Sequence, residues 1–169
     1  MRAYRYFILS FAILFLDQVT KILVNRLIPL YTIAWSFAGD FFRLIHVRNQ
    51  GVAFSMGSGF PEILRLVLFI VLPLFILGAV AFYLMKGKDL TDGQRWTLAA
   101  VVGGGLGNQI DRIFRPDGVV DFLDFKFYGL FGLERWPTFN VADATLVVSS
   151  IVLVILLYMQ ESRLRKAHE

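Results

Sequence analysis

The sequence predicts a mainly α-helical integral membrane protein with four transmembrane helices and a small extracytoplasmic β element. Of its 169 residues, 57% are hydrophobic and only 18% are charged, whereas about 25% charged is usual for soluble domains. A soluble domain of this size could not bury so much apolar surface. Four stretches also approach the roughly 20 apolar residues that a spanning helix needs. They lie at about 6–25, 63–85, 96–114 and 141–159, within a single membrane domain over 1–169.

The first span is predicted to be a retained helix. Like a signal peptide, it has a basic start and an apolar run, Phe7–Leu16, but it lacks a small-x-small cleavage site. Asp17 and Lys21 follow this run and lie four residues apart, on one helix face. Ionisable groups inside a span are costly and usually functional. Two interpretations stay open for this pair: a structural bridge that neutralises itself, or a substrate-facing pair.

Basic residues predict how the chain crosses the membrane. An even number of spans leaves both termini on one side, which carries eight Lys or Arg in the 25 residues of 1–6, 86–95 and 161–169. The opposite loops, 26–60 and 115–139, carry six in 60 residues. The positive-inside rule therefore places both termini in the cytoplasm and the two long loops outside.

The first outer loop contains a predicted hairpin over about 30–48. Gly39-Asp40 separates two runs rich in aromatic and β-branched residues, which is typical of a turn between two short strands. The aromatic rings suit the membrane interface, although a plain interfacial loop fits the pattern equally well. The second span follows at 63–85, with Pro61 at its entry and Pro73 expected to kink its middle.

The third span combines small and polar residues. Gly103, Gly107 and Asp111 recur every four residues and so share one helix face. Small residues let helices approach closely in lipid, so this face is predicted to pack inside the bundle and to bring Asn108, Asp111 and Arg112 with it. The segment is not a phosphate-binding loop, because the GK[ST] ending is missing and no predicted strand precedes it.

The fourth span begins near Asn140, and Asp143 follows three residues later. Asn140 is either a plain N-cap, a role this residue type often performs, or a member of a site. Asp143 lies in the first turn, where a carboxylate meets the positive end of the helix. The same outer end of the bundle receives Asp111 and a loop in which Asp121 lies within an apolar, strand-like stretch, Val119–Phe122.

Several carboxylates therefore converge near the outer membrane surface: Asp111, Asp121 and Asp143, with Asp124 as a further candidate. Two carboxylates held close cannot both ionise easily, so one keeps its proton while the other stays basic. Such a pair can hydrolyse a peptide bond without Cys, His or metal. The chain has no Cys and two His, which excludes thiol chemistry and leaves little for a metal cage. Periodicity alone leaves open which carboxylate pairs with Asp143.

At these residues the sequence resembles the lipoprotein signal peptidases, also called signal peptidase II. Each fragment alone is weak, but five in family order across four spans are highly specific. The five motifs are Asp17-x-x-x-Lys21, Asn49-Gln50-Gly51-Val52-Ala53-Phe54, Gly107-Asn108-Gln109-Ile110-Asp111-Arg112, Val119-Val120-Asp121-Phe122 and Phe139-Asn140-Val141-Ala142-Asp143.

The resemblance implies an aspartic endopeptidase of the bacterial inner membrane, with its active site at the extracytoplasmic face. Its substrate would be a prolipoprotein whose lipobox cysteine carries a diacylglyceryl group, and cleavage would fall just before that cysteine. The catalytic dyad maps onto Asp121 and Asp143, and Asp111 becomes a supporting residue. Other matching positions would bind substrate or support the site: Asn49, Gly51, Asn108, Arg112 and Asn140, with Asp17 and Lys21 in a less certain role.

The implied partners are the prolipoprotein, membrane lipids and the cyclic peptide inhibitor globomycin. No cofactor, metal or nucleic acid is expected. A proton-coupled small membrane transporter is the alternative, because membrane carboxylates also build proton relays. Such a relay usually has a carboxylate near mid-membrane and an inverted repeat. Here the carboxylates of the third and fourth spans gather at one face and no repeat is visible, which favours the peptidase.

Overall fold

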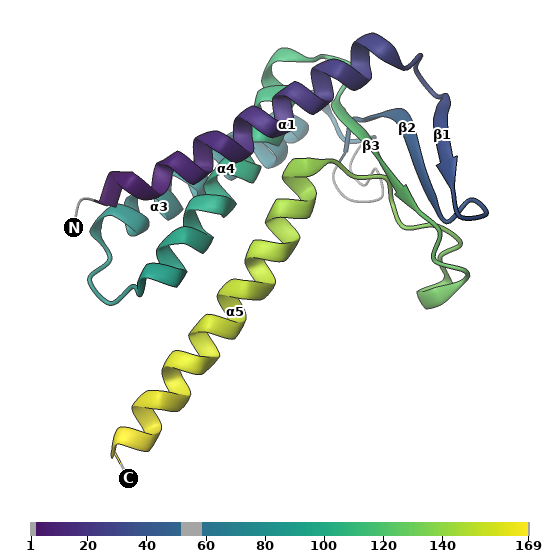
Figure 1. Cartoon of the computed structure of the whole chain (residues 1–169). Coiled ribbons are helices and arrows are strands. Elements are labelled where there is room, and N and C mark those ends of the chain that lie inside the picture. Colours follow the sequence, from purple (N-terminus) through teal and green to yellow (C-terminus); the bar gives the residue numbers. More distant parts are fainter. Residues whose placement is uncertain (1–2, 52–58, 169) are drawn as a thin grey trace.

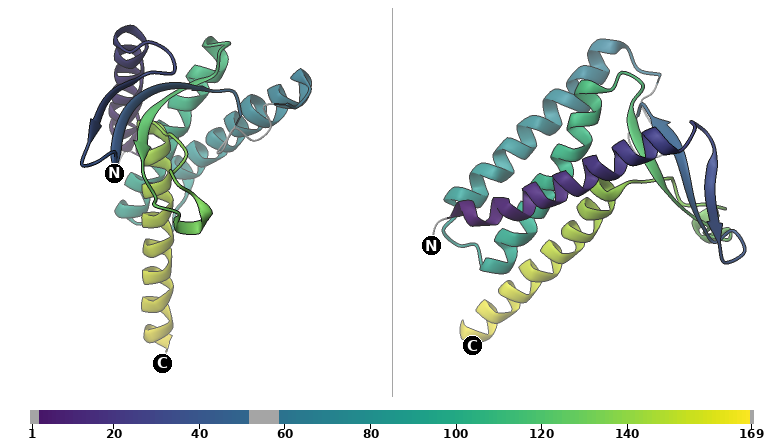
Figure 2. Two further views of the ribbon diagram at one scale, coloured as in Figure 1. Left: turned by 90° about the vertical axis from the view of Figure 1, so that its right-hand side faces the viewer. Right: turned by 45° about the horizontal axis from the view of Figure 1, so that its top comes forward.

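The computed structural model describes residues 3–51 and 59–168 (Figure 1). A bundle of long helices carries a small sheet at one end, and both chain termini lie at the ends of their helices that are remote from the sheet (Figures 1 and 2). The helices are η1 (Ala3–Tyr6), α1 (Phe7–Leu27), α2 (Glu62–Leu66), η3 (Val67–Val71), α3 (Leu72–Lys86), α4 (Asp92–Phe114), η4 (Leu130–Gly132) and α5 (Val141–His168). The strands are β1 (Ile33–Phe37), β2 (Phe42–Asn49) and β3 (Val119–Phe125).

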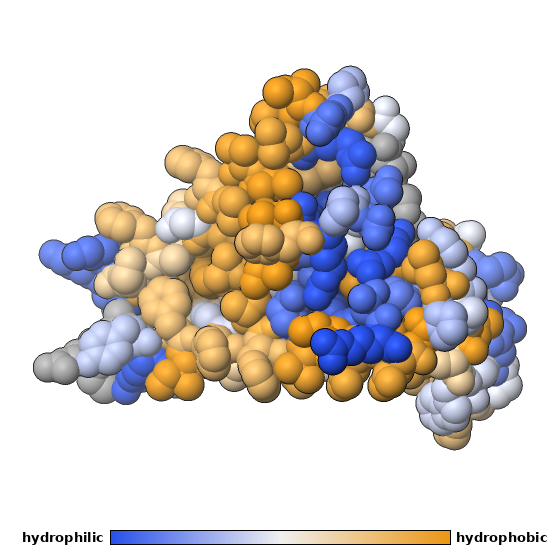
Figure 3. All heavy atoms as spheres, turned by 90° about the horizontal axis from the view of Figure 1, so that it is seen from above, coloured by the Kyte–Doolittle hydropathy of each residue, from blue (hydrophilic) through white to orange (hydrophobic). Residues whose placement is uncertain are grey.

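Three helical stretches in the described part of the chain are long and apolar enough to cross a membrane: Tyr4–Leu27, Glu62–Lys86 and Val141–Lys166. The predicted third span, α4, has 23 residues, about 34 Å, but its glycines and polar side chains make it less apolar. It contacts α1, α3 and α5 and contains many buried residues. Only a small part of its surface would therefore contact lipid and need to be apolar. Figure 3 shows a broad apolar surface on one side of the molecule, with a band of polar residues that runs along its border and further polar residues at its far end.

Two helices extend beyond their predicted bounds by four residues or more. Helix α4 begins at Asp92 instead of 96, because Thr91 and Gln94 form a reciprocal capping box there. Helix α5 continues to His168, past the predicted end at 159. The prediction stopped where the apolar run stopped, but the polar residues beyond it are mostly good helix formers.

The sheet has three antiparallel strands in the order β1-β2-β3. The predicted hairpin within 30–48 is confirmed, since β1 and β2 pair across a turn in which Gly39 and Asp40 both have positive φ. Strand β3 comes from the second outer loop and pairs with β2, with Val47 opposite Asp121. This pairing carries Asp121 from a distant part of the sequence to the top of the bundle.

The glycine-rich segment of α4 lets three helices approach it. A Cβ atom on Gly103 would lie 2.6 Å from the Ser10 carbonyl oxygen of α1, and one on Gly104 would lie 2.9 Å from the Ala142 carbonyl oxygen of α5. A Cβ on Gly105 would meet Leu77 of α3 at 2.4 Å. The predicted packing role of the segment therefore divides among Gly103, Gly104 and Gly105, which face α1, α5 and α3 in turn.

Gly103→Ala is expected to lower the free energy of unfolding by about 1–3 kcal/mol, because α1 must shift to admit the new methyl group. Gly78→Ala is the matched control, since Gly78 lies within α3 and a Cβ atom added there would meet no neighbouring atom within 4 Å. The control should be neutral or slightly stabilising. Thermal unfolding of the two variants in detergent compares them, and equal melting temperatures would contradict the close approach of α1.

Helices α2, η3 and α3 form one continuous helix with a π-helical middle. Pro73 has no N–H, so the carbonyl of Phe69, four residues earlier, loses its helical donor. The N–H of Leu72 bonds to Val67, five residues back, and the Gln109 side chain of α4 donates to the Phe69 carbonyl at 3.0 Å. In place of a simple kink at Pro73, the structure thus has a wider, π-helical turn, and the Gln109 hydrogen bond connects this turn to α4.

Candidate active site

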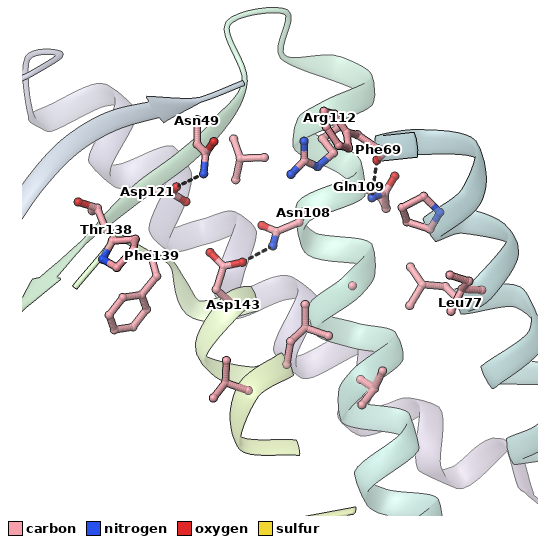
Figure 4. Close-up of a pocket in the computed structure, with 18 of the residues that line it drawn as sticks. Asn49, Phe69, Leu77, Asn108, Gln109, Arg112, Asp121, Thr138, Phe139 and Asp143 are labelled. Atoms are coloured by element: carbon pink, nitrogen blue, oxygen red, sulfur yellow. Dashed lines mark hydrogen bonds between the residues drawn. The ribbon is translucent and has the colours of Figure 1, made fainter. Parts of the chain in front are cut away.

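A cavity of about 530 Å³ lies where α3, α4, α5 and the inner edge of the sheet meet. Its deeper part is apolar and includes Leu77 and Val101. Its upper part is polar: Asn49, Asn108, Arg112, Asp121 and Asp143 line it. Figure 4 shows these side chains coming from four different elements, with the carboxylates of Asp121 and Asp143 on the same side of the cavity.

Asp121 lies on β3, is only 2% exposed and accepts two amide hydrogen bonds. Asn140 Nδ2 donates to its Oδ1 at 2.7 Å, and Asn49 Nδ2 donates to its Oδ2 at 3.2 Å. Burial raises the pKa of Asp121 to about 7, and the neighbouring Asp143 carboxylate adds to this rise. Asp121 can therefore hold a proton near neutral pH.

Asp143 lies in the first turn of α5 and is partly exposed. Asn108 Nδ2 donates to its Oδ1 at 2.7 Å. Its Oδ2 accepts the backbone N–H of Asn140 at 3.2 Å, while Asn140 Oδ1 accepts the backbone N–H of Asp143 at 3.0 Å. These two bonds form a reciprocal cap on α5.

Asn140 therefore fulfils both interpretations that the sequence left open. Its side-chain oxygen caps α5, while its amide nitrogen donates to Asp121 and, at 3.1 Å, to Asn108 Oδ1. Because Asn140 contacts both carboxylates and is fully buried, it fixes Asp121 and Asp143 as neighbours.

Asp111 lies behind this cavity in a buried charge network. Its carboxylate contacts Lys21 at 3.3 Å, pairs with Arg115, and accepts the Val120 backbone N–H at 3.0 Å. Lys21 also pairs with Asp17 at 2.9 Å. All three of these side chains are fully buried: Lys21, Asp17 and Asp111. The network therefore lies where a structural bridge between α1 and α4 would lie.

Asp17 extends this network to the start of α5. Its Oδ1 accepts the backbone N–H of Ala142 at 2.9 Å, one of the donors that the first helical turn leaves without an internal partner. This network of buried charged groups thus connects α1, α4, β3 and α5 directly behind Asp121 and Asp143.

Arg112 joins the cavity to the first outer loop. Its guanidinium donates to the Gly51 carbonyl at 2.7 Å and lies 5.4 Å from the centre of the Phe69 ring. Gly51 N–H in turn donates to Asn49 Oδ1 at 3.0 Å. The last three residues of that loop's motif, 52–54, lie outside the described residues.

Asp124, the further candidate carboxylate, lies away from the others. It is buried in the sheet and paired with Arg43 at 2.7 Å and Arg135 at 2.8 Å, which gives it a structural position.

Sequence reasoning missed two parts of the cavity wall. One is the segment 136–139, Trp136-Pro137-Thr138-Phe139, of which only Phe139 belongs to a predicted motif. The other is Gln109, which lies within a predicted motif but was given no role of its own, and whose amide reaches the Phe69 carbonyl. A proline in an apolar span was the available signal for Gln109, because it frees one carbonyl that a nearby donor must satisfy.

These features define a helical membrane protein with two neighbouring carboxylates in a largely apolar cavity beneath a small sheet. The chain belongs to the signal peptidase II family: the family model described as Signal peptidase (SPase) II matches residues 9–159. This confirms the membership predicted from the five motifs.

Named relatives and solved structures agree. The chain is 47% identical over 149 residues to the lipoprotein signal peptidase of Borreliella burgdorferi strain ZS7, covering 88% of this chain and 86% of that protein. It is 45% identical over 166 residues to that of Treponema denticola, covering 95% and 92%. A solved structure described as a bacterial membrane enzyme matches with a TM-score of 0.80 and 26% identity, covering 94% of this chain and 90% of the other.

Proposed function

We propose that this chain is an aspartic endopeptidase that removes the signal peptide from diacylglyceryl-modified prolipoproteins, with Asp121 and Asp143 as its catalytic pair. Signal-peptide removal from prolipoproteins follows from the family. The single observation that carries the aspartic mechanism is that Asn140 binds both carboxylates within one cavity. No metal ion is needed for this chemistry, and no covalent enzyme intermediate is formed.

The position of the cavity fits a substrate anchored in the membrane. Asp143 lies at the start of α5, at the end of the bundle that carries the sheet. We place this end at the extracytoplasmic face of the bacterial inner membrane and both termini in the cytoplasm, by the positive-inside rule, with α4 as the fourth crossing. The diacylglyceryl chains would hold the scissile bond at this depth, beside the carboxylates.

The apolar deeper wall suits the hydrophobic segment of a signal peptide. Leu77, Val101, Leu146 and Val147 line it, and α4 contributes Gly105 to its floor. Membrane lipids would meet the exposed apolar surface of the same helices. The transporter alternative finds no support in the family model or the relatives.

The decisive experiment is cleavage of a diacylglyceryl-modified prolipoprotein by the purified chain in lipid vesicles, with and without globomycin. We expect cleavage just before the lipidated cysteine, inhibition by globomycin, and at least about a hundredfold slower cleavage of the same precursor without its lipid. Equal cleavage of both precursors would contradict the proposed substrate. Cleavage that a metal chelator abolishes would contradict the aspartic mechanism.

A further inference from the structure

Asn108 and Asn140 each turn their amide nitrogen towards a carboxylate, and the buried ammonium group of Lys21 fixes the orientation of Asn108. Lys21 Nζ lies 2.9 Å from Asp17 Oδ2, 3.3 Å from Asp111 Oδ2 and 2.9 Å from Asn108 Oδ1. An ammonium group has three N–H donors and no acceptor. Asn108 must therefore turn its oxygen towards Lys21.

The orientation of the Asn108 amide determines which of its atoms meets Asp143. With its oxygen occupied by Lys21, Asn108 presents its amide nitrogen to Asp143 Oδ1 at 2.7 Å. The amide of Asn140 is fixed in the same manner, because its oxygen accepts the backbone N–H of Asp143 and its nitrogen faces Asp121. Neither amide can reverse without placing two donors against each other.

The two carboxylates have different surroundings. Asp143 is partly exposed in the first turn of a 28-residue helix, whose positive end favours a negative charge. Asp121 is 2% exposed on a strand, between Val120 and Phe122, which are 0% and 5% exposed. The raised pKa of Asp121, about 7, agrees with this difference.

The other charged groups nearby are largely paired with one another. Asp17 and Lys21 of α1 face Asp111 and Arg115 of α4 behind the cavity, and Asp124 of β3 is bound to arginines of the sheet. Arg112 of α4 lies on the cavity wall, bound to the Gly51 carbonyl.

We infer that Asp143 is the ionised carboxylate that takes a proton from water, that Asp121 is the protonated one, and that Lys21 is a positioning residue acting through Asn108. This division of roles rests on the proposed function. As Asp143 takes the proton, the water oxygen bonds to the scissile carbonyl carbon and Asp121 gives its proton to the carbonyl oxygen. Asp143 then protonates the leaving nitrogen as the C–N bond breaks, and Asp121 recovers a proton from the gem-diol.

The pH dependence of kcat/KM tests the division of roles. Activity should fall as the pH rises through the pKa of Asp121, about 7, because its proton is then lost. Asn49→Ala removes a donor to the Asp121 carboxylate, which makes ionisation harder, so the alkaline limb should move up by about one pH unit. Asn108→Ala removes a donor to Asp143 and should leave the alkaline limb in place.

Asn25→Ala is the matched control, because Asn25 is an exposed amide at the end of α1, and it should move neither limb. If Asn108→Ala moved the alkaline limb and Asn49→Ala did not, the roles would be reversed. If neither variant moved a limb, the inference would be wrong, although cleavage of the lipidated precursor would still support the proposed function.

Infrared spectroscopy gives a second test that needs no turnover. At a pH below the pKa of Asp121, the folded wild-type chain should show a protonated-carboxyl stretch that Asp121→Asn loses and Asp143→Asn keeps. The opposite pattern would assign the proton to Asp143 and overturn the inference.

Discussion

Asp143→Asn and Asp121→Asn are each expected to lower cleavage of a lipidated prolipoprotein by about a thousandfold or more. An asparagine amide has almost the shape of the carboxyl group but can neither accept the proton of water nor supply one, and such transfers contribute about 10²–10⁴-fold to rates. Single-turnover cleavage in vesicles measures the loss, and thermal unfolding checks that each variant is folded.

Asp124→Asn is the control for this pair. Asp124 lies on the same strand as Asp121 and is equally buried, but it pairs with Arg43 and Arg135. Its substitution should lower the melting temperature and leave turnover of the folded fraction within about twofold of wild type. Substantial turnover by folded Asp121→Asn or Asp143→Asn would refute the proposed catalytic pair.

Lys21→Met is expected to reduce the free energy of unfolding by about 3–5 kcal/mol, since it leaves the buried carboxylates of Asp17 and Asp111 without their shared cation. Lys21 and both carboxylates are fully buried, so water cannot replace the lost ion pairs. Thermal unfolding in detergent measures the change. Lys86→Met, at the exposed end of α3, should leave the melting temperature within about 1–2 °C of wild type.

A double substitution tests whether the loss of charge causes the expected instability of Lys21→Met. In Asp17→Asn/Lys21→Met one charge of each sign is removed, and Asp111 keeps its pairing with Arg115. The double variant should be more stable than Lys21→Met alone, a strongly non-additive result for neighbouring residues. Additive losses would show that Lys21 stabilises the bundle through its packing, and not through its charge.

The sequence was informative wherever a pattern is local. The spacing of Asp17 and Lys21 predicted one helix face, and the two residues do form an ion pair. The two runs of aromatic and β-branched residues on either side of Gly39-Asp40 predicted the hairpin that β1 and β2 form. The start of α5 at Asn140 also follows from local capping chemistry.

Contacts between distant segments could not be predicted in this way. The third partner of Lys21, Asn108, depends on how closely α1 approaches α4. The pairing of β3 with β2 depends on the register of two loops that are far apart in the chain. Residues alone therefore left open which carboxylate accompanies Asp143, and only the family resemblance indicated Asp121.

The reciprocal cap on α5 also links the proposed site to the order of the elements along the chain, since β3 with Asp121 precedes α5 with Asp143. The bonds between Asn140 and Asp143 that begin the helix are the same bonds that hold the second carboxylate beside Asp121. A nascent chain that has inserted α1, α3 and α4 but not α5 has only one of the two carboxylates. With Asp121 and Asp143 as the proposed catalytic pair, a chain that lacks α5 is therefore expected to be inactive in the membrane.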